Sequence, residues 1–225
     1  MTAFLTTTTI YSDGVYNVHS SLKKRFTRAL REFDPKADDT FVLVTLENLQ
    51  SLVLADLLLA VEEEYNVKIH HLHLGKKLPL EVHQRLSSSP LIVSSKTLQT
   101  KPENYSQVKV KVASTISLYP PDALYVLPFT ADDLACYFLL ELLNGNMTGL
   151  VLEAEARTAY PLYSTTNREI QGIFRDSSLE TTLYGNCGLL AELEGRIALQ
   201  AFGNFYVQTF IKGYYGRFRH NGLRR

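Results

Sequence analysis

The fold of this chain is decided by residues 41–74, which read FVLVTLENLQSLVLADLLLAVEEEYNVKIHHLHL. The first six residues are rich in apolar and β-branched side chains, as is typical of a buried strand. A strongly apolar helix is predicted over residues 49–65, and Val67–Leu74 alternates as a second strand. Because a crossover of about twenty residues joins the strands, we expect them to pair in parallel.

Strand and helix patterns continue to alternate outside this unit. A helix is predicted over residues 15–33 and is stopped by Asp34-Pro35. Strands are expected over residues 108–116, 123–127 and 148–152, and helices over 79–86, 131–144, 165–174, 179–183 and 189–202. Residues 90–106 show the least regular pattern. The chain is therefore predicted to be an α/β protein with a parallel, doubly wound, Rossmann-like sheet and helical additions at both ends.

The composition excludes several classes of protein. The 23 basic residues balance the 23 acidic residues, so a nucleic-acid partner would need a local basic patch. Cys136 and Cys187 are too few for a disulfide framework and are expected to be buried thiols. No signal peptide or membrane-spanning run is recognised, so we expect a cytoplasmic protein. His70, His71 and His73 are interpreted as ordinary strand histidines, and no metal site is predicted.

The turn after the first strand is where a doubly wound sheet binds phosphates. Such a turn needs glycines that let backbone amides close on the anion. None occurs here, and Glu47 would repel a phosphate by a few kcal/mol at about 4 Å near a protein surface. We predict that the turn has lost nucleotide binding and that the chain uses no cofactor, although Ser51 could still touch a phosphate. The turn consists of Leu46, Glu47, Asn48, Leu49, Gln50 and Ser51.

The order of these motifs resembles the N-type ATP pyrophosphatases that modify tRNA. In that family a Ser-Gly-Gly-x-Asp-Ser loop follows the first strand, and only Ser51 matches it here. Residues 128–146, PFTADDLACYFLLELLNGN, are similar to the family's Gly-His-Asn-x-Asp-Asp-x-Ala helix without its Gly-His. Residues 160–170, YPLYSTTNREI, resemble its later Arg-Pro-Leu and Lys/Arg-Glu-Ile element. Together the likenesses cover residues 15–175.

Within that superfamily the chain is most similar to the degenerate second subunits of the cytosolic tRNA wobble-uridine 2-thiolation complex. The resemblance implies a non-catalytic subunit that binds a catalytic thiolase and tRNA, while the partner uses ATP and a ubiquitin-like sulfur carrier to thiolate uridine 34. The expected organisation is a basic helix (1–36), a degenerate α/β domain (37–175) and a helical segment with a basic tail (176–225). The Cys-x-x-Cys pairs common in those subunits are missing from the sequence.

Two basic segments are the candidate contacts to tRNA. The first helix carries five cations within nine residues, and the tail mixes cations with aromatic side chains that suit unpaired bases. The residues concerned are Lys23, Lys24, Arg25, Arg28, Arg31, Arg217 and Arg219. Asp132 and Asp133 are interpreted as a first-turn acidic pair rather than as magnesium ligands. Two alternatives stay open: an active adenylating enzyme that uses Ser51 with these aspartates, and a protein–protein adaptor without an RNA role.

Overall fold

A computed structural model of the chain describes residues 13–36, 38–65, 67–184, 199–209 and 212. Within these residues, five parallel strands form one sheet in the order β3-β2-β1-β4-β5. The chain winds outward in both directions from β1 and β4, which confirms the predicted doubly wound α/β fold. The strands span Thr40–Thr45 (β1), Lys68–Leu74 (β2), Ile92–Leu98 (β3), Leu124–Val126 (β4) and Arg157–Ala159 (β5).

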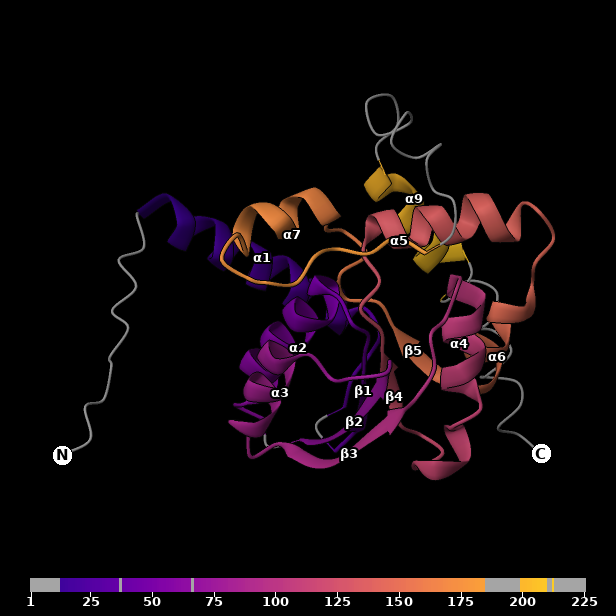
Figure 1. Cartoon of the computed structure of the whole chain (residues 1–225), viewed down its shortest axis with the longest axis horizontal. Coiled ribbons are helices and arrows are strands. Elements are labelled where there is room, and N and C mark those ends of the chain that lie inside the picture. Colours follow the sequence, from indigo (N-terminus) through magenta and orange to yellow (C-terminus); the bar gives the residue numbers. More distant parts are fainter. Residues whose placement is uncertain (1–12, 37, 66, 185–198, 210–211, 213–225) are drawn as a thin grey trace.

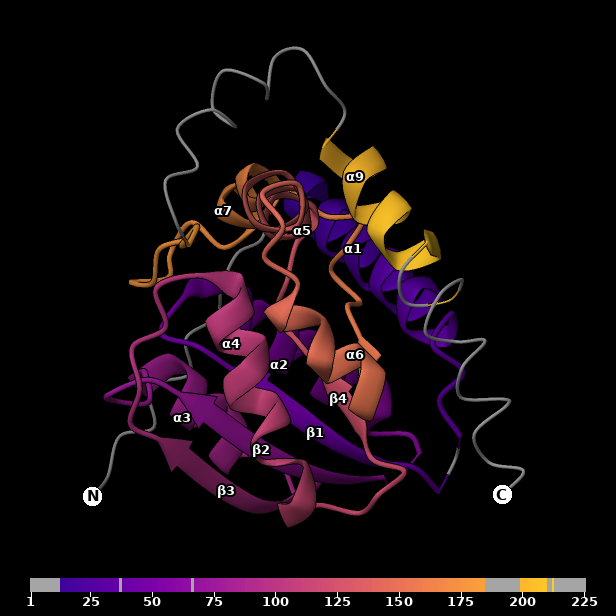
Figure 2. The same ribbon diagram turned by 90° about the vertical axis from the view of Figure 1, so that its right-hand side faces the viewer.

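Helices cover both faces of the sheet, as Figures 1 and 2 show. Along β1, Phe41 and Leu43 pack into one core with α1, α2, α3 and α7. Val42 and Val44 pack into the opposite core with α4, α5, α6 and α9. The helices are α1 (Asp13–Arg31), α2 (Leu49–Glu62), α3 (Leu80–Ser87), α4 (Tyr105–Ala113), α5 (Ala131–Cys136), α6 (Val151–Glu155), α7 (Asn167–Ile173) and α9 (Leu199–Tyr206). Both faces of β1 are therefore buried, as expected for a central parallel strand.

The predicted strand over residues 108–116 is wrong, because α4 occupies most of this segment and the short helix η1 (Ile116–Leu118) follows it. The Asn104 side chain caps α4 by accepting a hydrogen bond from the Gln107 amide at 2.8 Å. Val108 and Val112, four residues apart, are buried, whereas Val110 is exposed. The alternation of valine with lysine imitated a strand, but the apolar residues that are buried follow the period of a helix.

Four further segments differ from the sequence prediction. Residues 148–152 form the short helices η3 (Thr148–Leu150) and α6 instead of a strand. Residues 92–98, within the stretch expected to be irregular, form the edge strand β3. Residues 179–183 are not helical, and β5, which has three residues, was not predicted. Of the helix expected over 189–202, residues 189–198 lie outside the described residues.

The helix predicted over residues 131–144 begins where expected. Thr130 and Asp133 form a capping box, and α5 continues as the π-helical segment η2 (Tyr137–Leu142). Cys136 at the end of α5 is buried and disulfide-bonded, so the expectation of a buried thiol is wrong for this residue. Cys187 lies outside the described residues. No described helix is long and apolar enough to cross a membrane.

Candidate functional site

The turn between β1 and α2 is closed by its own side chains. The Asn48 carboxamide oxygen accepts hydrogen bonds from the Ser51 amide at 3.1 Å and from the Ser51 hydroxyl at 2.7 Å. The same hydroxyl accepts a hydrogen bond from the Leu46 amide at 2.7 Å. All three residues are buried. The serine that matches the family motif is therefore occupied inside the turn, and its hydroxyl does not face an open phosphate site.

A second layer covers the start of α2. Residues 178–184, called the strap here, follow α7 and run toward α5 in Figure 1. The Leu49 amide donates to the Glu180 carbonyl at 2.9 Å. The buried Gln50 side chain donates to the Thr182 carbonyl at 2.9 Å and accepts from the Thr182 amide at 3.2 Å. The amides of Leu49 and Ser51, which an anion would need at this helix start, are thus already bonded within the protein.

The strap is held at both of its ends. At its beginning, the Glu81 carboxylate accepts from the Ser178 amide at 2.8 Å and from the Ser177 hydroxyl at 2.7 Å. At its end, the Tyr184 amide donates to the Tyr105 hydroxyl at 3.2 Å. These contacts place the strap between α3 and α4, across the carboxyl ends of the central strands.

Glu47 bonds to the loop that follows β2. Its side chain is exposed, and one carboxylate oxygen accepts a hydrogen bond from the Lys77 amide at 2.8 Å. A Cβ added at Gly75 would lie 2.8 Å from Glu47 Cγ and 2.6 Å from His73 Nε2, so glycine leaves room for this arrangement. The carboxylate is committed to the loop after β2.

Asp132 and Asp133 both lie below 5% exposure and bond to the protein. Asp132 accepts from the Asn167 amide at 2.6 Å, which joins α5 to α7. Asp133 accepts from the Thr130 amide at 2.8 Å and from the Tyr105 hydroxyl at 2.8 Å. Burial raises the pKa of Asp133 to about 7, against the lowering effect of these hydrogen bonds. The pair lies in the first turn of α5, where it caps this helix and joins it to α7.

The three histidines of β2 contact hydroxyl groups on the neighbouring strands. His71 Nε2 and His73 Nδ1 lie 2.7 Å and 2.9 Å from the Thr45 hydroxyl, which places these two rings on one face. His70 lies 2.6 Å from the Ser94 hydroxyl on the neighbouring strand. Burial lowers the pKa of His71 to about 4 and lowers that of His73, so both are neutral at pH 7. Within the described residues, no cluster of three or more His, Cys, Asp or Glu side chains could hold a metal ion.

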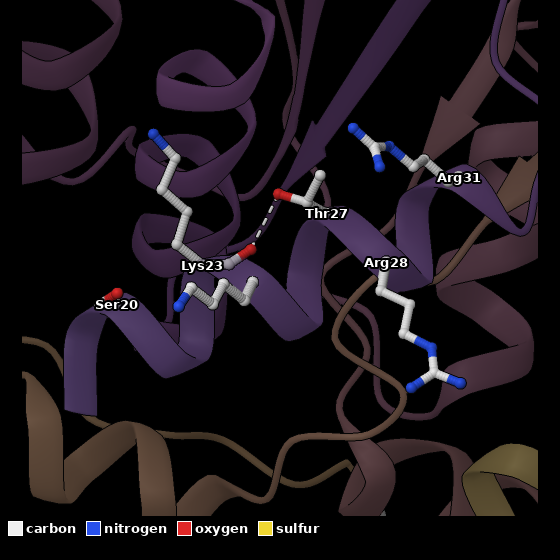
Figure 3. A pocket seen from close by; sticks show the side chains of 6 residues that line it. Ser20, Lys23, Thr27, Arg28 and Arg31 are labelled. Atoms are coloured by element: carbon white, nitrogen blue, oxygen red, sulfur yellow. Dashed lines mark hydrogen bonds between the residues drawn. The ribbon is translucent and has the colours of Figure 1, made fainter. Parts of the chain in front are cut away.

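The structure gathers four of the five cations predicted on the first helix. A surface hollow of about 450 Å³ on α1 is lined by Ser20, Lys23, Lys24, Thr27, Arg28 and Arg31. We call it the basic hollow. Its cations are exposed and project from successive turns of α1 (Figure 3). Arg25 lies apart from it, because its guanidinium pairs with Glu169 in α7.

The C-terminal tail adds one described contact. Lys212 forms an ion pair with Glu32 at 2.7 Å, near the end of α1. Arg217 and Arg219 lie outside the described residues. The sequence reasoning did not identify the strap or its partners Tyr105 and Gln50, and no local pattern marks them, because each contact joins residues that are far apart in the chain.

The fold and the site together define a doubly wound α/β domain whose turn after the first strand is filled by its own side chains. Among solved structures, the chain is similar to the U34-tRNA thiolase NcsA from Methanococcus maripaludis, which was described with its [4Fe-4S] cluster. The TM-score is 0.59 at 11% identity, over 92% of this chain and 80% of that chain. The NAD+ synthetase from Burkholderia pseudomallei gives 0.46 at 11% identity, over 92% and 91%. The thiolase likeness shows a shared fold. No protein-family model and no curated protein sequence matches the chain.

Proposed function

We propose that this chain is a non-catalytic subunit of a tRNA-thiolating heterodimer and helps to position tRNA for 2-thiolation of wobble uridine 34. The catalytic partner would supply the ATP chemistry and receive sulfur from a ubiquitin-like carrier, and the complex would act in the cytoplasm. The shared fold with a U34-tRNA thiolase supports the link to tRNA thiolation.

The observation that carries the non-catalytic role is the state of the α2 N-terminus. Asn48 bonds the Ser51 amide, and Glu180 bonds the Leu49 amide. A triphosphate would have to displace both contacts and the strap before it could reach these donors. Each hydrogen bond to be broken contributes about 1 kcal/mol, and a buried group left without a partner costs more. A subunit that positions substrate without catalysing the reaction is expected to keep the fold while the amides that would bind phosphate are already bonded.

The basic hollow supports the tRNA-positioning role. Lys24, Arg28 and Arg31 are exposed, and none of them forms an ion pair with another described residue that would neutralise its charge. Their charge is therefore available to phosphates, even though the chain as a whole is neutral.

A tRNA-binding titration at several salt concentrations tests this proposal. Replacing Lys24, Arg28 and Arg31 together by glutamate should weaken binding and lower the slope of log K against log salt by about 1 for each phosphate contact removed. The matched control reverses three exposed lysines elsewhere, namely Lys96, Lys101 and Lys111. Equal tRNA affinity of the hollow variant and the parent would refute the positioning role and favour a protein–protein adaptor.

Calorimetry with ATP and magnesium tests the non-catalytic half of the proposal. The isolated chain should show no heat of ATP binding at micromolar protein. Micromolar affinity, together with pyrophosphate release that Asp133→Ala abolishes, would overturn the proposal in favour of an active adenylating enzyme. A pull-down that recovers a thiolase paralogue in one-to-one ratio tests the heterodimer.

A further inference from the structure

A second, smaller hollow adjoins the basic hollow, and the two share Thr27 and Arg31. Its volume is about 200 Å³, below the ~300–1,000 Å³ typical of sites for drug-sized ligands, so it suits one small group. It lies where α2 ends and where β1 and β2 begin, at the opposite end of the strands from the strap. Its lining residues are Thr27, Leu30, Arg31, Pro35, Lys36, Val61, Glu62, Tyr65 and Val67.

The wall of this pocket contains a carboxyl group that has no bonding partner in the part of the chain that the structure describes. Glu62 is 6% exposed, and among the described residues no hydrogen bond or ion pair reaches its carboxylate. Burial raises the pKa of Glu62 to about 7. A buried carboxylate is unfavourable unless donors bond to it, and such a group in a cleft is typical of a binding site. The Glu62 carboxylate therefore lines the pocket without a bonding partner among the described residues, and an N–H donor of a ligand can bond to it there.

The surroundings of Glu62 restrict the chemistry of that donor. Arg31 and Lys36 line the same pocket, and the cations of the basic hollow adjoin it, so a cationic ligand would be repelled. Leu30 and Val67 are buried and give the pocket apolar walls, whereas Tyr65 is 52% exposed at its margin. A flat, neutral group with N–H donors and an attached anion satisfies all of these features at once.

A nucleotide has this combination, and guanine fits the carboxylate best among the bases. Its Watson–Crick edge presents two adjacent donors, an imino N–H and an amino group, to the two oxygens of a carboxylate. Adenine offers one donor group beside an acceptor, and uracil places one N–H between two acceptors, so neither pairs with both oxygens. An exposed tyrosine beside such a site is the usual stacking partner of an unpaired base.

We propose that this pocket binds one unpaired guanine of an RNA strand, with Glu62 accepting from its Watson–Crick edge, Tyr65 stacking on its ring and the adjoining phosphates lying along the basic hollow. The inference rests on the proposed tRNA-positioning function and assigns the base contact of the same surface. The site is separate from the turn after β1.

Anisotropy titrations of the full chain with labelled RNA pentamers test the assignment. The central base of an otherwise all-uridine strand is guanine, inosine, adenine or uridine. Inosine keeps the imino donor but lacks the amino group, so it should bind ~10-fold or more weakly than guanine, as expected for one lost hydrogen bond to a charged acceptor. Equal affinities of the guanine, inosine and adenine strands would overturn the proposal.

Variants identify the residues responsible. Glu62→Gln should bring the preference for guanine over uridine to within about threefold, because the amide presents one acceptor oxygen and an NH₂ donor in place of two acceptor oxygens. Glu63→Gln, an exposed neighbour, is the matched control and should keep the preference. Tyr65→Ala changes an exposed ring without opening the core and should weaken guanine binding ~5-fold or more. A preference that survives both Glu62→Gln and Tyr65→Ala would overturn the assignment to this pocket.

Two outcomes separate this inference from the proposed function. If no base is preferred but charge reversal in the basic hollow still weakens tRNA binding, the guanine pocket is refuted and the positioning role stands. If neither tRNA nor any pentamer binds, both are refuted. Free guanosine monophosphate serves as a competitor, and an affinity equal to that of the guanine pentamer would refute the RNA strand as the source of the base.

Discussion

The contacts between Gln50 and the strap can be tested directly. Gln50→Ala removes the two hydrogen bonds that join the α2 start to Thr182, at 2.9 Å and 3.2 Å. Each contributes about 0.5–1.5 kcal/mol net, so the free energy of opening the strap should fall by about 1–3 kcal/mol. Released groups regain water, so we expect no larger effect.

Hydrogen exchange measures this opening directly. The strap amides, including that of Thr182, should exchange ~5–150-fold faster in Gln50→Ala, because exchange tracks the local opening equilibrium. Amides of β1 should keep their parental protection. Gln84→Ala, an exposed glutamine on α3, is the control and should leave both segments unchanged. Unchanged strap exchange in Gln50→Ala would refute the reasoning that these two contacts hold the strap.

The same variant distinguishes the two layers over the turn. With the strap loosened, the Ser51 hydroxyl and amide still bond to Asn48, so the turn remains filled. Calorimetry should therefore detect no ATP binding by Gln50→Ala. Micromolar ATP affinity in this variant would show that the strap alone blocks the site, contrary to the geometry of Asn48 and Ser51.

Two other predictions concern buried charges. Lys109 is fully buried between Glu153 and the Tyr206 hydroxyl. Lys109→Ala should lower the free energy of unfolding by about 3–5 kcal/mol, because it leaves the charge of Glu153 buried without a counter-charge. In urea denaturation, the double variant Lys109→Met with Glu153→Gln should have a stability closer to that of the parent. Burial raises the pKa of Asp133 to about 7 from an ordinary value of 3.8, so its contribution to stability is full below about pH 4 and is lost as the pH rises through 7. The pKa of Glu62 is also raised, so Glu62 likewise loses its contribution to stability as the pH rises through 7. Asp133→Asn should therefore reduce the fall in thermal unfolding temperature between pH 5 and pH 8 without abolishing it. A steeper fall of the unfolding temperature in Asp133→Asn would contradict the sign given for Asp133. A Lys109→Ala variant as stable as the parent would contradict the role given to the buried ion pair.

The central part of the fold was predictable because its patterns are unambiguous. Length, composition and bounding residues all indicate the same element for the strand from Phe41, the helix from Leu49 and the strand that ends at Leu74. The strand assigned to residues 108–116 failed because alternating valine and lysine fit a period of two. Only the three-dimensional structure shows that Lys109 is buried in the core, where it is held by Glu153. Local pattern carries no information on such a pairing.

The candidate site was predictable only in its local features. The lack of glycine in the turn and the cluster of cations on α1 are visible in the sequence. The Gln50–Thr182 contact joins residues 132 positions apart, and residues 179–183 had a helical pattern, so the strap was hidden. In the sequence, Arg25 is one of the five clustered cations of α1. In the structure it pairs with Glu169 and does not line the basic hollow.

The structure adds a second physical reason for the closed turn to the electrostatic one that the sequence predicts. Glu47 is expected to repel a phosphate, and its carboxylate bonds to the Lys77 amide. The donors of the turn are occupied by an asparagine and a serine within it and by a strap carbonyl above it. Removing the charge of Glu47 would leave every one of these contacts in place. Recovery of a phosphate site therefore requires both a glycine-like backbone at Asn48 and removal of the strap, two independent changes that no single substitution achieves.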